Sequence, residues 1–160
     1  MRTIDSVISL IAKVISWLTI LLILTIVIDV IFRYSMSITS AASFELEWHF
    51  FSAIFLLGSA YALQNDRHVR VDVFYQKFSE KRKAWVDIFG ILLFLFPFCV
   101  ITIWESLSFV SNSFEINETS PQPGGLPFRW IIKAAIPAGF GLLLLQGLSL
   151  LIKNFKILRN

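Results

Sequence analysis

Four long apolar stretches, separated by three polar gaps, occupy most of this chain of 160 residues. A helix needs about 20 predominantly apolar residues to cross a bilayer core, where every backbone polar group must be satisfied within the segment. The pattern predicts an all-α integral membrane protein, with a single membrane domain over residues 1–160. We expect its four transmembrane helices at about residues 12–33, 44–63, 84–111 and 130–153.

Positive charge indicates how these helices are oriented. The N-terminal tail holds two of the fourteen Lys and Arg residues, the middle gap holds six and the C-terminal tail holds three. Because Lys and Arg concentrate in cytoplasmic loops, both termini and the middle gap are predicted to face the cytoplasm. The net charge of +3 is therefore a topology signal and gives no support to a nucleic-acid partner.

The middle gap, residues 66–80, is predicted to lie at the cytoplasmic membrane interface. Asp72 is placed to cap a short amphipathic helix over residues 73–78, whose apolar face would contact lipid. Trp85 follows at the start of the third membrane helix, where an aromatic ring anchors a helix at headgroup level.

The last gap contains a compact outward-facing loop over residues 119–128. Three prolines restrict its backbone, so we expect a rigid loop without regular secondary structure. At membrane depth, Asp29 precedes Arg33 by four residues, the favourable order for an ion pair on one helix. Ion transport by Asp29 is the alternative role. Gln146, deep in the fourth helix, is expected to hydrogen-bond another helix.

Catalytic and cofactor-binding patterns are absent from the sequence. Glu45, Glu47 and His49 cluster at the start of the second helix, where the helix dipole favours negative charge. Metal binding there would need further ligands. We find no Ser/His/Asp set and no phosphate-binding loop, so the chain is predicted to be neither an enzyme nor a cofactor-binding protein.

Six short motifs match one family of membrane proteins. They are Arg33-Tyr34, Glu45-Leu46-Glu47-Trp48, Leu57-Gly58-Ser59-Ala60, His68-Val69-Arg70-Val71-Asp72, Gly125-Leu126-Pro127 and Ile136-Pro137-Ala138-Gly139. Over nearly its whole length, the chain resembles the small membrane subunit (DctQ-like) of tripartite ATP-independent periplasmic (TRAP) transporters. The run from His68 to Asp72 is the most specific of the motifs.

The resemblance implies a multi-pass protein of the bacterial inner membrane in a heteromeric complex. In such transporters a periplasmic binding protein captures an organic anion, typically a carboxylate, and a large membrane subunit imports it with a sodium gradient. The small subunit binds no substrate, supports the large subunit and helps to dock the binding protein.

The resemblance also suggests roles for individual residues. His68, Arg70 and Asp72 would fix the protein at the inner interface. Asp29, Arg33, Trp85 and Gln146, taken from the residue patterns above, are the other structural candidates. The docking candidates are Glu45, Glu47, Glu115, Glu118, Pro123, Gly124 and Gly125. Family members often carry two adjacent glutamates where Leu46 here separates Glu45 from Glu47, so the separate roles of this pair stay open.

Two other functions remain possible from the sequence. An autonomous four-helix carrier or exporter, acting as a homodimer, would need an essential membrane carboxylate, and Asp29 and Glu105 are the candidates. An assembly subunit of a redox complex would need paired histidines or cysteines in the membrane. The chain has one cysteine, Cys99, and its two histidines lie at opposite membrane sides.

Overall fold

The computed structural model describes residues 2–65, 75 and 77–159, and the regular structure in these residues is helical. The elements are α1 (Arg2–Met36), α2 (Ala41–Gln64), α4 (Glu80–Gly90), the π-helical turn η1 (Ile91–Leu95), α5 (Phe96–Glu115) and α6 (Trp130–Arg159). α4, η1 and α5 join into one span, so the described chain has four helices long and apolar enough to cross a membrane. The predicted all-α architecture with four membrane helices is confirmed.

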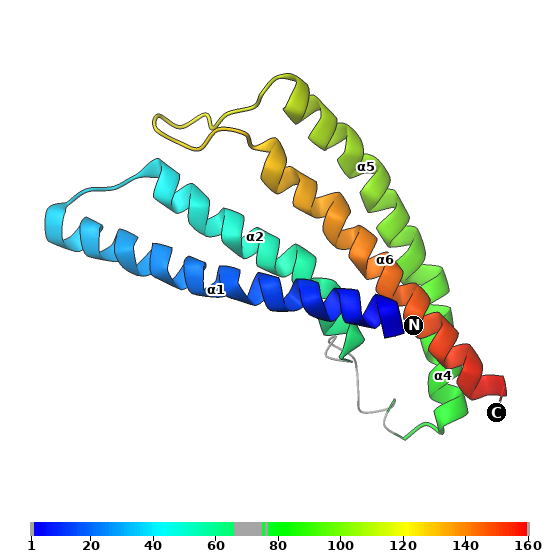
Figure 1. Cartoon of the computed structure of the whole chain (residues 1–160). Helices are drawn as coiled ribbons and strands as arrows, with labels where there is room; N and C mark the ends of the chain where they lie inside the picture. The colour runs from blue at the N-terminus through cyan, green and yellow to red at the C-terminus, as the bar shows by residue number, and fades with distance from the viewer. Residues whose placement is uncertain (1, 66–74, 76, 160) are drawn as a thin grey trace.

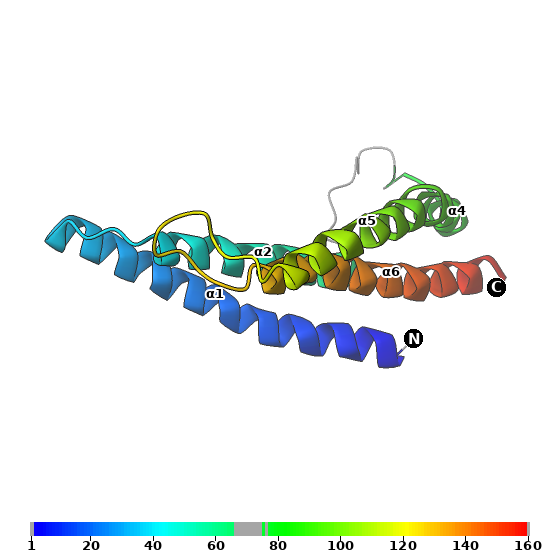
Figure 2. The same cartoon turned by 90° about the horizontal axis from the view of Figure 1, so that it is seen from above.

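The spans form two antiparallel hairpins that meet along α2 and α6. α1 packs on α2, α2 packs on α6, and α6 packs on α4 and α5. Figure 1 shows the two hairpins side by side, with α2 next to α6, and Figure 2 shows α2 and α6 between α1 and α5. Both termini lie at one end of the bundle, here called the terminal end. Residues 37–40 and 116–129 connect helices at the opposite end, here called the loop end.

α6 is the central helix. In its most apolar 18-residue stretch, 39% of the residues are buried inside the bundle, against 11% to 17% in the corresponding stretches of the other three spans. Two glycines permit its close packing. A Cβ at Gly139 would lie 2.6 Å from the Leu56 carbonyl oxygen of α2, and one at Gly147 would lie 2.6 Å from Leu95 Cδ2. These contacts are of the small-residue kind that lets membrane helices approach closely.

Large apolar side chains cover the outside of the bundle. Trp17, Phe94 and Trp104 are mostly exposed, as are many Leu, Ile, Val and Phe side chains on every span. A soluble monomer rarely exposes such continuous apolar surface. Lipid tails satisfy it without cost, which agrees with a multi-pass membrane protein.

At the terminal end, the first turns of α1 are tied to two other helices by polar contacts. Asp5 pairs with Lys153 of α6 at 2.9 Å and accepts a hydrogen bond from the Ser149 hydroxyl at 3.0 Å. The Gln64 side chain of α2 donates to the Asp5 carbonyl oxygen at 3.1 Å. These contacts hold the first turns of α1 against α2 and α6, ahead of the membrane helix predicted to begin near residue 12.

Several predictions for the middle gap fall on residues that the structure does not describe. These are half of the short amphipathic helix, and the candidates His68, Arg70 and Asp72. The interfacial helix remains a prediction, as does the cytoplasmic orientation of the termini. Trp85 is half-exposed on α4 and stacks on Phe89, with ring centroids 5.6 Å apart.

Candidate functional site

The 116–129 loop is folded on itself at the loop end of the bundle. The Ser120 N–H donates to the Leu126 carbonyl, and the Arg129 N–H donates to the Glu118 carbonyl, both at 3.0 Å. The Gly125 N–H closes a turn onto Gln122 at 3.0 Å, next to Gly124 with φ 75°. Left-handed backbone of that kind favours glycine. The loop is thus a fixed element of the structure, although it contains neither helix nor strand.

Glu45, near the start of α2, binds this loop on the side that faces the bundle. Its side chain is buried, with an exposed fraction of 5%. One carboxylate oxygen accepts a hydrogen bond from the Leu126 N–H at 2.7 Å, and the other accepts one from the Ser120 hydroxyl. A buried carboxylate needs such partners, because an unpaired charge away from water is costly.

Gly125 is required by the same contact. A Cβ at this position would lie 2.9 Å from Glu45 Oε2 and still closer to the Ser120 side chain. The structure therefore gives Glu45 and Gly125, both docking candidates from the sequence, an inward-facing role. They shape the loop, and other residues form its exposed surface.

Glu118, at the start of the loop, connects it to α6. Its carboxylate pairs with Lys133, and with Arg129 at 4.0 Å. The hydrogen bond from Lys133 is the main cause that holds the pKa of Glu118 below its usual value. Lys133 also lies over the Phe109 ring of α5 at 3.9 Å from its centroid. One carboxylate thus joins the loop, α6 and, through Lys133, the face of α5.

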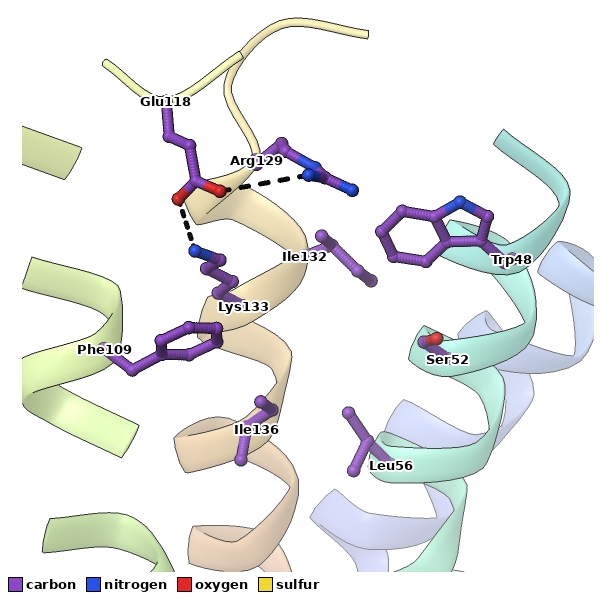
Figure 3. Close-up of a pocket in the computed structure, with 9 residues that line it drawn as sticks. All are labelled: Trp48, Ser52, Leu56, Phe109, Glu118, Arg129, Ile132, Lys133 and Ile136. Carbon is purple, nitrogen blue, oxygen red and sulfur yellow. Dashed lines mark hydrogen bonds and ion pairs between the residues drawn. The ribbon is translucent and has the colours of Figure 1, made fainter. Parts of the chain in front are cut away.

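A groove of about 420 Å³ opens beneath the loop, with α6 between α2 and α5. Figure 3 shows Glu118, Arg129 and Lys133 at its upper edge, with apolar side chains below them. The guanidinium of Arg129 lies over the Trp48 ring at 5.6 Å from its centroid. The lining residues are Trp48, Ser52, Leu56, Phe109, Glu118, Arg129, Ile132, Lys133 and Ile136.

The remaining docking candidates differ in exposure. Pro123 and Gly124 lie on the exposed crest of the loop, and Glu115 is exposed at the end of α5. Glu47 is partly buried on α2. The structure thus brings Glu45, Gly125 and the base of the loop together, while Glu115 and the crest face away from the bundle.

The structural candidates lie away from this site. Asp29 is buried and forms an ion pair with Arg33 on the same helix. Gln146 is completely buried beside Asp5, and no direct hydrogen bond to its amide forms within the described residues. Among all the residues that the structure describes, no group of three or more His, Cys, Asp and Glu side chains could hold a metal ion.

Three charged or polar residues of the site were not among the candidates from the sequence: Ser120, Arg129 and Lys133. Arg129 directly precedes α6 and Lys133 follows it by four residues, so the first turn of the helix brings them to one side, and this spacing was an available signal. Nothing local marks Ser120 as a partner of Glu45, because the two lie 75 residues apart.

Comparison with known protein families gives a match over most of the chain. A family model described as "Tripartite ATP-independent periplasmic transporters, DctQ component" matches residues 22–157. The match runs from within α1 to the last turns of α6 and includes the 116–129 loop. Comparison with curated proteins gives no match.

Proposed function

Because this chain belongs to the family of DctQ components of tripartite ATP-independent periplasmic transporters, we propose that it presents a docking surface for the periplasmic binding protein of its complex. In this proposal the protein is a non-catalytic subunit of the inner membrane, with its loop end in the periplasm. It supports a large membrane subunit that imports an organic anion of carboxylate type with a sodium gradient.

The fixed 116–129 loop supports the docking role. A surface that binds another protein loses less conformational entropy on binding when it is ordered beforehand. Here Glu45 and Glu118 order the loop from below, and they leave its crest exposed. The two carboxylates at membrane depth are otherwise engaged: Asp29 is paired with Arg33, and Glu105 is exposed on α5. An autonomous carrier would use such a carboxylate, so the supporting role is favoured.

The docking role is tested on the exposed crest. The Gln122 backbone takes part in the turn, whereas its side chain is exposed, so Gln122→Trp adds bulk without removing a contact that shapes the loop. We expect this variant, in the assembled transporter, to weaken binding of the substrate-loaded binding protein about tenfold or more, as bulk at the centre of a packed interface does. Uptake should fall with it.

The matched control is Arg82→Trp, at an exposed position near the terminal end. It adds the same bulk on the side predicted to be cytoplasmic and should leave binding unchanged. Equal affinities of the binding protein for Gln122→Trp and wild type would contradict the docking role. Equal losses in both variants would show a general defect in the complex and count against a specific surface.

A further inference from the structure

The groove beneath the loop changes character along its length. Leu56, Ile132 and Ile136 form its lower, apolar part, and Glu118, Arg129 and Lys133 form its upper edge (Figure 3). The charged edge lies near the first residue of α6, whereas the apolar part follows the helix toward the middle of the bundle. A phospholipid leaflet has the same order, with charged headgroups at its surface and hydrocarbon chains below them.

The charges at the upper edge are of both signs. The side chains of Lys133, Glu118 and Arg129 are exposed by 16%, 24% and 25%, so each is partly withdrawn from water yet still reaches the groove. Glu45 lies outside the lining of the groove but close enough to Arg129 for their charges to interact. With Glu45 counted, two carboxylates balance two cations. An anion or a cation entering this neutral edge would leave one charge in excess. A zwitterion would not.

We propose that this groove binds a zwitterionic phospholipid with an ammonium headgroup, of the phosphatidylethanolamine type. Its phosphate oxygens accept hydrogen bonds from Arg129 and Lys133, and its ammonium group donates to Glu118. One acyl chain lies against Leu56, Ile132 and Ile136. Glu118 has acceptor capacity for this, since a carboxylate offers about four lone-pair sites. A choline headgroup has no N–H to donate and does not fit the edge equally well.

The size of the groove agrees with partial enclosure of one lipid. A volume of about 420 Å³ lies within the range of about 300–1,000 Å³ that is usual for small-ligand pockets. It accommodates a headgroup and the upper part of one chain, and the rest of the lipid stays in the bilayer. The proposal goes beyond the docking role and does not depend on it, because it concerns this chain and its membrane alone.

The test uses the full chain, reconstituted into nanodiscs that contain equal amounts of phosphatidylethanolamine and phosphatidylglycerol. The protein is then released into mild detergent, and retained lipids are identified by native mass spectrometry. Wild type should retain one phosphatidylethanolamine. In Glu118→Gln the ammonium group loses its charged partner, so retention should fall about tenfold, which corresponds to the loss of one charge-assisted hydrogen bond. The edge then has excess positive charge, and preference should turn to phosphatidylglycerol.

Two further variants distinguish lipid binding in the groove from general effects of substitution on folding or charge. Ile136→Phe fills the apolar part and leaves every charge in place, so it should reduce retention of both lipids even if Glu118→Gln folds poorly. Arg159→Gln removes an exposed cation from the far end of the same helix and should change nothing. The proposal is overturned if wild type retains the two lipids in their bulk ratio, or if Glu118→Gln and Ile136→Phe retain lipid as wild type does. A photo-crosslinker at Ser52 that captures another protein instead of phosphatidylethanolamine in native membranes would also overturn it.

Discussion

At each end of the bundle, a carboxylate on one helix binds residues that are distant in sequence, but the two sets of contacts have different effects. At the terminal end, Asp5 of α1 joins Lys153 and Ser149 of α6, so it links helix to helix. At the loop end, Glu45 of α2 takes both of its hydrogen bonds from a loop, which packing of the helices does not require. The first arrangement holds the bundle together, and the second shapes a surface.

The partners differ in kind as well as in purpose. Lys153 is 40% exposed, so water screens its pair with Asp5, and a pair of this sort contributes little to stability. Glu45 is buried, and it accepts hydrogen bonds from a backbone N–H and a hydroxyl of the partly buried loop residues Leu126 and Ser120. An unsatisfied buried donor costs more than a weakened surface pair. The loop end should therefore be the more sensitive of the two to a single substitution, and its response should stay local.

The largest effect is expected from Glu45→Ala. Leu126 and Ser120 lose their shared acceptor, so amides in the 116–129 loop should exchange hydrogen about tenfold faster or more, while amides near the C-terminus of α6 keep their wild-type rates. Hydrogen exchange followed by mass spectrometry measures both regions in one sample. Glu47→Ala, two residues along the same helix, is the control and should leave loop exchange unchanged. Uniformly faster exchange along the chain would show that Glu45 supports the bundle itself.

A smaller effect is expected from Asp5→Ala, which breaks the contacts at the terminal end. We expect a loss of about 1 kcal/mol, because the Lys153 pair is partly exposed and one further hydrogen bond is lost. Thermal unfolding in detergent should show a lower midpoint, and loop exchange should not change. Glu80→Ala, which removes the exposed i,i+3 pair with Lys83, is the control with no expected shift. Faster loop exchange in Asp5→Ala would mean that the two ends are coupled.

The sequence predicted those features that depend on composition or on short spacing. Hydropathy located four membrane helices, because a span needs an uninterrupted apolar length whatever it packs against. The spacing of Asp29 and Arg33 indicated a pair that the helix itself brings together. In both cases the cause lies within one helix.

Features that depend on distant residues were not predictable in the same way. The Glu45 contacts with Ser120 and Leu126 span 75 and 81 residues, and the Asp5 contact with Ser149 spans 144 residues. The resemblance to the transporter subunits placed Glu45 among the docking candidates on the outward surface. Its burial follows from the way the loop folds back over α2, and no local pattern encodes that return.

The smallest effect is expected from pH at the loop end. Contact with Lys133 lowers the pKa of Glu118 from its ordinary value of 4.5, so the folded loop binds this proton less readily than the unfolded loop does. The resulting stability is complete above pH 4.5 and is lost as pH falls through the lower, folded value. Trp48, over which Arg129 lies, can report the change by fluorescence in a variant whose other four tryptophans are replaced by phenylalanine. We expect a modest transition below pH 4.5 that is absent in Glu118→Gln. A transition that persists in Glu118→Gln would assign the pH response to a different carboxylate, with Glu45 the next to test.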